Sequence, residues 1–123
     1  MENLNNVFLD YVNNVSVEKE LILASTFLTH VSNHGNILTS EVEDDYLIVM
    51  SDSRKYYAVF TNEEEAALAS RGNVVEKNLD ELVEKCLETS EIKGFCINPY
   101  NPSPCIISRY YIQAMLMSEA GAF

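Results

Sequence analysis

The chain has 123 residues, of which 47% are hydrophobic, so it is long enough to bury one core without help from metals or disulfides. Nineteen acidic residues against eight basic ones leave a formal net charge of -11 at pH 7. This charge opposes binding to nucleic acids and anionic membranes, and it favours a basic protein as partner. The simpler explanation is that an acidic surface keeps a small protein soluble.

The three cysteines have spacings that match no zinc or redox motif. The first residues lack the basic and apolar regions of a signal peptide, and no apolar run approaches the length of a membrane span. We therefore expect a single cytoplasmic domain, residues 1–123, that uses no metal and no cofactor.

The N-terminal third predicts two helices and a strand. Apolar residues from Leu4 onward recur at helical spacing, and the asparagines at 13 and 14 end this first helix. Ser16 caps a second helix from Val17 to about Ala24. The β-branched segment 25–31 then predicts a strand. The apolar face of the first helix consists of Leu4, Val7, Phe8, Tyr11 and Val12.

Two groups of polar residues follow that segment. His30 and His34 are four residues apart, a spacing that would place both imidazoles on one helix face, but Gly35 indicates a turn, so we expect no metal site. The acidic segment 41–45 lacks the glycine and the ligand spacing of a calcium loop, so it predicts a solvated turn. Its acidic residues are Glu41, Glu43, Asp44 and Asp45.

A strand that runs directly into a helix is the central feature of the sequence. Residues 56–60 are aromatic and β-branched, and with the apolar run 46–50 they predict a hairpin. The side chains of Thr61 and Asn62 can cap the first turn of a helix, where the acids at 63–65 suit the helix dipole. Because these carboxylates occupy the helix start, we expect no phosphate site there.

The C-terminal half predicts further short elements. Gly72 ends the junction helix and precedes a short strand at 73–76. Asn78 starts an amphipathic helix, with Glu81 placed to complete a capping box. Segments 95–97 and 105–107 form a hairpin around a proline-rich turn, and Ser108 caps a last helix with Tyr111 and Ile112 inward. Residues 120–123 are expected to fray.

These elements do not alternate strictly between strand and helix, which predicts an α+β fold with one mixed sheet packed by amphipathic helices. Cys86 lies on the buried stripe of its helix and should be inert. Cys96 and Cys105 flank the proline-rich turn and could face one another, which would allow a cross-strand disulfide in an oxidising compartment; we expect both to be reduced.

The order of several short motifs resembles the N-terminal domain of the SseB family. These motifs are Leu23-Ala24-Ser25-Thr26, Val59-Phe60-Thr61-Asn62 and Ile97-Asn98-Pro99, and the resemblance extends from Leu4 to Leu116. Asn62 stands where the family usually has serine, and longer members continue into a second domain that is absent from the printed sequence. The resemblance implies a bacterial α/β fold without an established reaction.

Three functions remain open. The first is a non-catalytic interaction domain, such as an adaptor or an inhibitor of a basic protein, whose acidic surface comprises Glu41, Glu43, Asp44, Asp45, Glu63 and Glu64. The second is a thiol enzyme with Cys96 or Cys105 as nucleophile and His30 or His34 as base. The third is a small-ligand site beside Tyr57, Tyr100, Tyr110 and Tyr111. We expect function at the edge where Thr61, Asn62, Asn98, Pro99 and Tyr100 come together, and Tyr57 is a further candidate binding residue.

Overall fold

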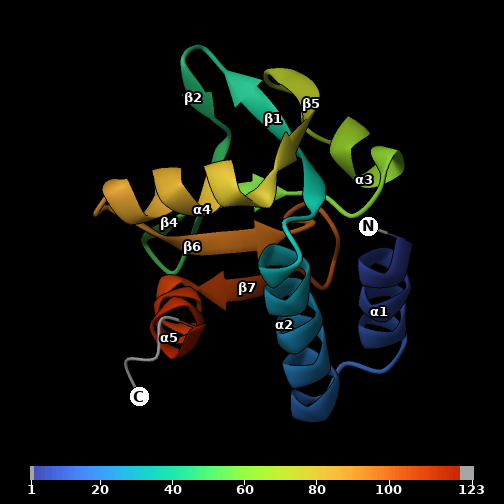
Figure 1. Ribbon diagram of the computed structural model, residues 1–123. Coiled ribbons are helices and arrows are strands. Elements are labelled where there is room, and N and C mark those ends of the chain that lie inside the picture. The colour runs from blue at the N-terminus through green and yellow to red at the C-terminus, as the bar shows by residue number, and fades with distance from the viewer. Residues whose placement is uncertain (1, 120–123) are drawn as a thin grey trace.

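The computed structural model describes residues 2–119, which form five helices and seven strands (Figure 1). The helices are α1 (Glu2–Asn13), α2 (Val17–Ser32), α3 (Glu63–Ala67), α4 (Leu79–Glu88) and α5 (Arg109–Glu119). The strands are β1 (Asn36–Val42), β2 (Asp45–Tyr46), β3 (Ile48–Ser51), β4 (Arg54–Val59), β5 (Asn73–Asn78), β6 (Ile92–Ile97) and β7 (Cys105–Ser108). The tail expected to fray lies outside the described residues.

The strands form two sheets instead of the single sheet expected. One is antiparallel with the order β2-β1-β5, and the other has the order β3-β4-β6-β7. The second sheet is mixed, because β4 and β6 run parallel while its other neighbours are antiparallel. The α+β class is therefore confirmed, and the predicted mixed sheet is one of two.

Leu47 is where the chain passes from one sheet to the other. Its amide donates to the Ser40 carbonyl at 2.8 Å, and its carbonyl accepts from the Ala58 amide at 2.9 Å. The run 46–50, which predicts one strand, is thus divided between β2 and β3. Strand β1 was not predicted, and Glu41 lies within it opposite Tyr46, so the solvated turn predicted for 41–45 is limited to positions 43 and 44.

The strand predicted for residues 25–31 is wrong, because α2 continues as one helix to Ser32. Leu23, Phe27 and Val31 recur every fourth residue and are all buried, so a helix places the three side chains on one core-facing stripe. An alternating strand would also have placed the polar Ser25 and Thr29 on the core-facing side, whereas the helix leaves both exposed. Burial of this stripe outweighs the β propensity of the segment.

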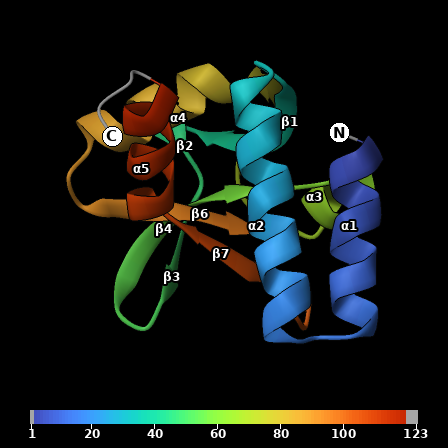
Figure 2. The same cartoon turned by 60° about the horizontal axis from the view of Figure 1, so that its bottom comes forward.

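The main core lies between the four-stranded sheet and the helices α1, α2, α4 and α5. Phe8 and Phe27 are buried against sheet residues such as Tyr57 and Phe95, and the Phe27 and Phe95 rings lie 5.7 Å apart. Figure 2 shows α1 and α2 side by side as an antiparallel pair beside the sheet, with α5 near the other end of β6 and β7. The opposite face of the sheet forms a smaller core. That core contains Leu38, Leu47, Ala58, Phe60 and Ala66.

Most predicted caps and turns are confirmed. The side chain of Asn62 accepts from the Glu65 amide at 2.8 Å, and that of Asn78 accepts from the Asp80 amide at 2.9 Å, without the predicted capping box. Helix α3 ends at Ala67, before the predicted stop at Gly72, whose positive φ of 81° serves the turn into β5.

The predicted hairpins β3–β4 and β6–β7 are both present. In the first, Asp52 and Ser53 both have positive φ, as a tight two-residue hairpin requires. In the last helix, Ser108 accepts from the Tyr110 amide as expected. Ile112 is buried, but Tyr111 is exposed and not inward as expected.

Candidate functional site

The parallel pair of strands brings two predicted site residues together. Val59 at the end of β4 lies opposite Ile97 at the end of β6, so the segments that follow both strands leave the sheet at one edge. Ligand sites in α/β proteins commonly lie outside the carboxyl ends of parallel strands. Thr61 and Asn98 meet at this edge.

Asn98 holds the two segments together. Its side-chain oxygen accepts from the Thr61 amide at 3.0 Å, and its side-chain nitrogen donates to the Thr61 hydroxyl oxygen at 2.9 Å. Both residues are buried, and Asn98 has a positive φ of 51°, a conformation that asparagine tolerates better than most residues. The pair is therefore closed to solvent and acts as a structural tie.

Asn5 of α1 extends the tie to the N-terminal helix. Its side-chain oxygen accepts from the Thr61 hydroxyl at 2.8 Å and from the Asn62 side chain at 2.9 Å. We call Asn5, Thr61, Asn62 and Asn98 the amide cluster. Nothing in the sequence near Asn5 signals this role, because 56 residues separate it from Thr61.

A carboxylate lies at the border of this cluster. Asn101 donates from its side chain to Glu65 Oε2 at 3.1 Å and accepts from the Ser103 amide at 2.9 Å. The other oxygen, Glu65 Oε1, is buried and has no hydrogen-bond partner within residues 2–119. Sequence reasoning assigned Glu65 to the helix dipole alone and did not single out Asn101.

The remaining predicted binding residues separate into exposed and buried ones. Tyr100 stacks on Phe60 with ring centroids 6.5 Å apart and remains 44% exposed, and Pro99 beside it is half-buried. A hollow of about 360 Å³ lies next to them, on the face of the four-stranded sheet opposite the main core. It is lined by Val49, Met50, Ser51, Cys96, Pro99, Tyr100, Pro104 and Ile106.

Tyr57 is a core residue and presents no surface to a partner, contrary to its selection as a binding residue. It is fully buried, its hydroxyl donates to Asp45 Oδ1 at 3.1 Å, and burial raises its pKa to about 12. The same Asp45 oxygen accepts from the Tyr46 amide at 2.8 Å. Asp45 is therefore committed to the fold and only partly available to a partner.

The two predicted acidic groups do not share one surface. Glu43 and Asp44 form the exposed tip of the β1–β2 hairpin, whereas Glu63 and Glu64 lie on α3, away from that tip in Figure 1. The α3 acids border an open hollow of about 460 Å³ together with Asn5, Leu9 and Asn62. Each group therefore presents its own small negative surface.

The cysteines are buried and free. Cys105 lies opposite Ile97, and Cys96 lies opposite Ile106, so the two thiols point to opposite faces of the sheet and cannot form the cross-strand disulfide considered above. Burial raises the pKa of Cys96 to about 11 and that of Cys105 to about 12, and it also raises the pKa of Cys86. None of them has the low pKa of an activated nucleophile.

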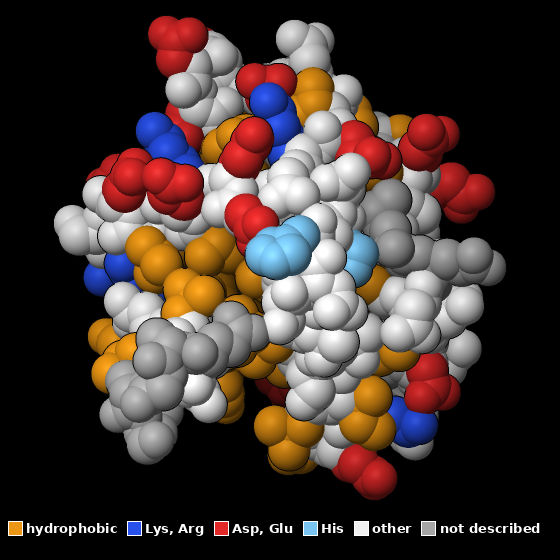
Figure 3. Space-filling view, viewed as in Figure 1, with side chains coloured by type: hydrophobic (Ala, Val, Ile, Leu, Met, Phe, Trp, Pro, Cys, Tyr) orange, Lys and Arg blue, Asp and Glu red, His pale blue; other side chains and the backbone are white. Residues whose placement is uncertain are grey.

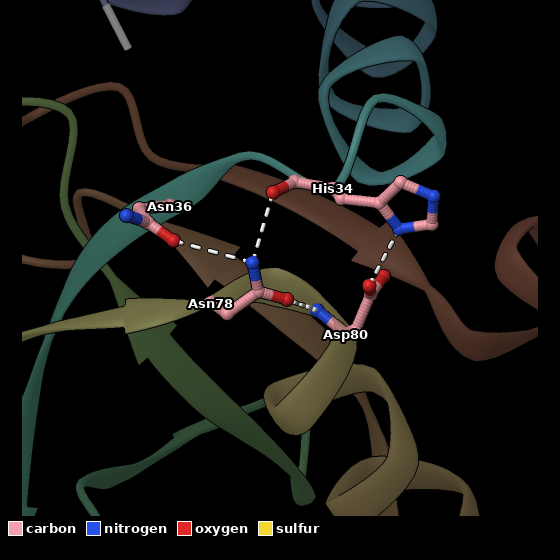
Figure 4. Close-up of polar contacts among 4 residues, drawn as sticks. All are labelled: His34, Asn36, Asn78 and Asp80. Atoms are coloured by element: carbon pink, nitrogen blue, oxygen red, sulfur yellow. Dashed lines mark hydrogen bonds and ion pairs between the residues drawn. The ribbon is translucent and has the colours of Figure 1, made fainter.

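The histidines do not form a metal pair. His30 lies on α2 and its Nε2 donates to the Asn36 carbonyl at 2.6 Å, while His34 lies beyond the helix end with a positive φ of 57°. Figure 4 shows His34 pointing to Asp80 at the start of α4, with Nδ1 2.6 Å from the carboxylate. Asn78 also donates to the His34 carbonyl, at 2.8 Å, which fixes this loop.

Residues 2–119 contain neither a metal-binding cluster nor a helix able to span a membrane. No group of three or more His, Cys, Asp and Glu side chains within this range is arranged to hold a metal ion. None of the helices within the range has the length and apolar character needed to cross a bilayer.

An apolar groove between α4 and α5 was missed by sequence reasoning. Its volume is about 370 Å³. We call it the α4–α5 groove. Its lining consists of Val31, Asp80, Val83, Glu84, Leu87, Glu88 and Leu116. The sequence shows the helical spacing of Asp80, Glu84 and Glu88. It does not show that these residues border apolar residues of other helices.

No model of a known protein family matches the chain, and no curated protein or solved structure is significantly similar to it. The resemblance to the SseB family accordingly stays a prediction.

Proposed function

We propose that this protein is a non-catalytic binding domain that holds a basic protein, as an adaptor or an inhibitor. The observation that carries this proposal is the net charge of -11, with the acidic side chains at the β1–β2 tip and on α3 and α4 exposed to solvent. Such a charge raises the rate of encounter with a basic partner and repels acidic competitors. The SseB resemblance supports the same proposal, since that family has no established reaction.

The buried thiols argue against the alternative of a thiol enzyme. A nucleophilic cysteine must be ionised near neutral pH, and the pKa values of about 11 and about 12 at Cys96 and Cys105 leave both protonated. His30 and His34, the proposed bases, are bound to the Asn36 carbonyl and to Asp80. This arrangement favours the binding domain.

The test is to capture a partner by cross-linking in the source cells and then to reconstitute the complex from purified components. We expect a defined stoichiometry and a dissociation constant that rises roughly tenfold between about 50 mM and about 300 mM sodium chloride, because salt screens exposed charges. A complex whose affinity ignores salt would count against the proposal, as would failure to recover any partner that rebinds in purified form.

A small-ligand site is the second candidate, and the hollow beside Tyr100 favours it. This hollow has a volume of about 360 Å³ and a lining that combines apolar side chains with the exposed face of Tyr100, as ligand sites often do. A fragment screen followed by nuclear magnetic resonance tests it. Fragments that shift the signals of Cys96 and Ile106 in the wild type, and not in Tyr100→Ala, would support it.

A further inference from the structure

We propose that the basic partner binds through a cationic amphipathic helix that lies in the α4–α5 groove; this inference rests on the function proposed above. Figure 3 shows hydrophobic side chains gathered between α4 and α5, with acidic side chains along the α4 side. The groove thus combines an apolar floor with a negative border.

The apolar floor supplies the area that a partner helix would bury. Val83 of α4 and Val31 of α2 are buried at its base, and Leu87 of α4 and Leu116 of α5 supply its accessible apolar surface. Leu87 and Leu116 are only partly buried and pack against the main core, so the floor is continuous with that core. A partner would cover the surface that these side chains leave exposed, and burial of apolar surface is favourable.

The negative border is regularly spaced. Asp80, Glu84 and Glu88 recur every four residues, so their positions along the α4 axis are about 6 Å apart. The ion pairs of the described residues include one from Asp80 to His34 but none from Glu84 or Glu88. Lys85 does not line the groove, since it points about 100° around the helix from Glu84.

The spacing and the surroundings identify the occupant. A helix with Lys or Arg every four residues repeats its positive charges at the same interval of about 6 Å and satisfies its own backbone groups. An extended segment would find no strand edge in a groove lined by helices, so its backbone would gain no partners. A second copy of this chain is disfavoured, because two molecules each of charge -11 repel one another.

The test uses a fluorescent synthetic helix of about 18 residues with leucines on one face and lysines on the other. A scrambled peptide of the same composition controls for charge without an amphipathic face. The protein variants are Glu84→Lys/Glu88→Lys and, as a matched control with the same change in charge, Glu43→Lys/Asp44→Lys at the β1–β2 tip. All four positions are exposed, and a thermal melt verifies that each variant folds.

We expect the groove variant to raise the dissociation constant of the helix at least about tenfold, and the tip variant to raise it less than about threefold. Nuclear magnetic resonance shifts should concentrate on α4 and α5, and the scrambled peptide should bind more weakly. An equal loss of affinity in both variants, resonance shifts outside α4 and α5, or no binding of the helix would contradict the proposal that the helix binds in the groove. The proposed function is tested separately with the captured partner. If that protein binds the groove variant as tightly as the wild type, the binding function is supported but the groove is not its binding site.

Discussion

Asn98 is the residue on which the meeting of β4 and β6 depends most directly. Truncation to alanine would leave the buried Thr61 amide without its acceptor, would leave the Thr61 hydroxyl with only its bond to Asn5, and would place alanine at a φ of 51°. We expect Asn98→Ala to lower the free energy of unfolding by about 3 kcal/mol, from unsatisfied polar groups and backbone strain. Chemical denaturation measures it. Asn14→Ala, at an exposed asparagine, is the control. Equal effects in both variants would contradict the role of Asn98 in joining the segments that follow β4 and β6.

The three thiols give a second prediction at the level of single residues. Because all are buried and their pKa values are raised, we expect a disulfide reagent at neutral pH to modify them far more slowly in the native protein than in denaturant. Ser90→Cys, which adds an exposed thiol, provides the fast reference. Rapid modification of Cys96 or Cys105 in the native protein would instead restore the thiol-enzyme alternative.

At the scale of elements, Arg109 joins the end of α4 to the start of α5. Its guanidinium donates to the carbonyls of Leu87 at 3.2 Å, Thr89 at 3.2 Å and Ile92 at 2.8 Å. It thereby satisfies the carbonyls of Leu87 and Thr89, which lie at the end of α4 and have no partner within the helix, and ties them to Ile92 at the start of β6. These bonds also hold in place the two helices that form the groove.

Loss of this cap should weaken the fold. We expect Arg109→Gln to reduce the free energy of unfolding by about 2 kcal/mol, since hydrogen bonds from a charged donor are removed. Arg54→Gln, at an exposed arginine, should have little effect. Hydrogen exchange should speed up at the end of α4 in the first variant alone, and uniform exchange in both would disprove the capping role.

Helix α2 shows how far local pattern predicts an element. Ser16 predicted its start, and the structure confirms the cap, with the Lys19 amide 3.2 Å from the hydroxyl oxygen. The continuation beyond Ala24 was not predicted, because β-branched residues in 25–31 favour a strand locally. The burial of Phe27 and Val31 against the sheet decided the helix, and that contact involves residues far along the chain.

On the scale of the whole molecule, alkaline pH should lower the stability of the fold. Burial raises the pKa of Cys96 from 9.0 to about 11, that of Cys105 from 9.0 to about 12 and that of Tyr57 from 10.0 to about 12. At pH values between the ordinary pKa and the raised pKa of each group, the native state binds more protons than the unfolded state. The free energy of unfolding is therefore unaffected by these groups below about pH 9 and falls as the pH rises toward about 12.

Urea midpoints at about pH 8 and about pH 10.5 test this dependence. We expect a lower midpoint at the higher pH, and a smaller decrease in Cys96→Ala/Cys105→Ala, which lacks two of the groups whose pKa is raised. Equal midpoints at both pH values would mean that these groups are not buried as described.

The sequence alone determined the α+β class, the two hairpins, the starts of α2, α3 and α4, and the acidic character of the surface. These features depend on residues close together in the chain, such as Asn62 and Asn78 at their helix starts, or on composition. Only the tertiary structure decided the second sheet, the length of α2, the amide cluster and the border of acids beside the α4–α5 groove. Each of these requires distant segments to meet, as Asn5 does with Thr61, and which distant segments meet is set by burial of the whole core.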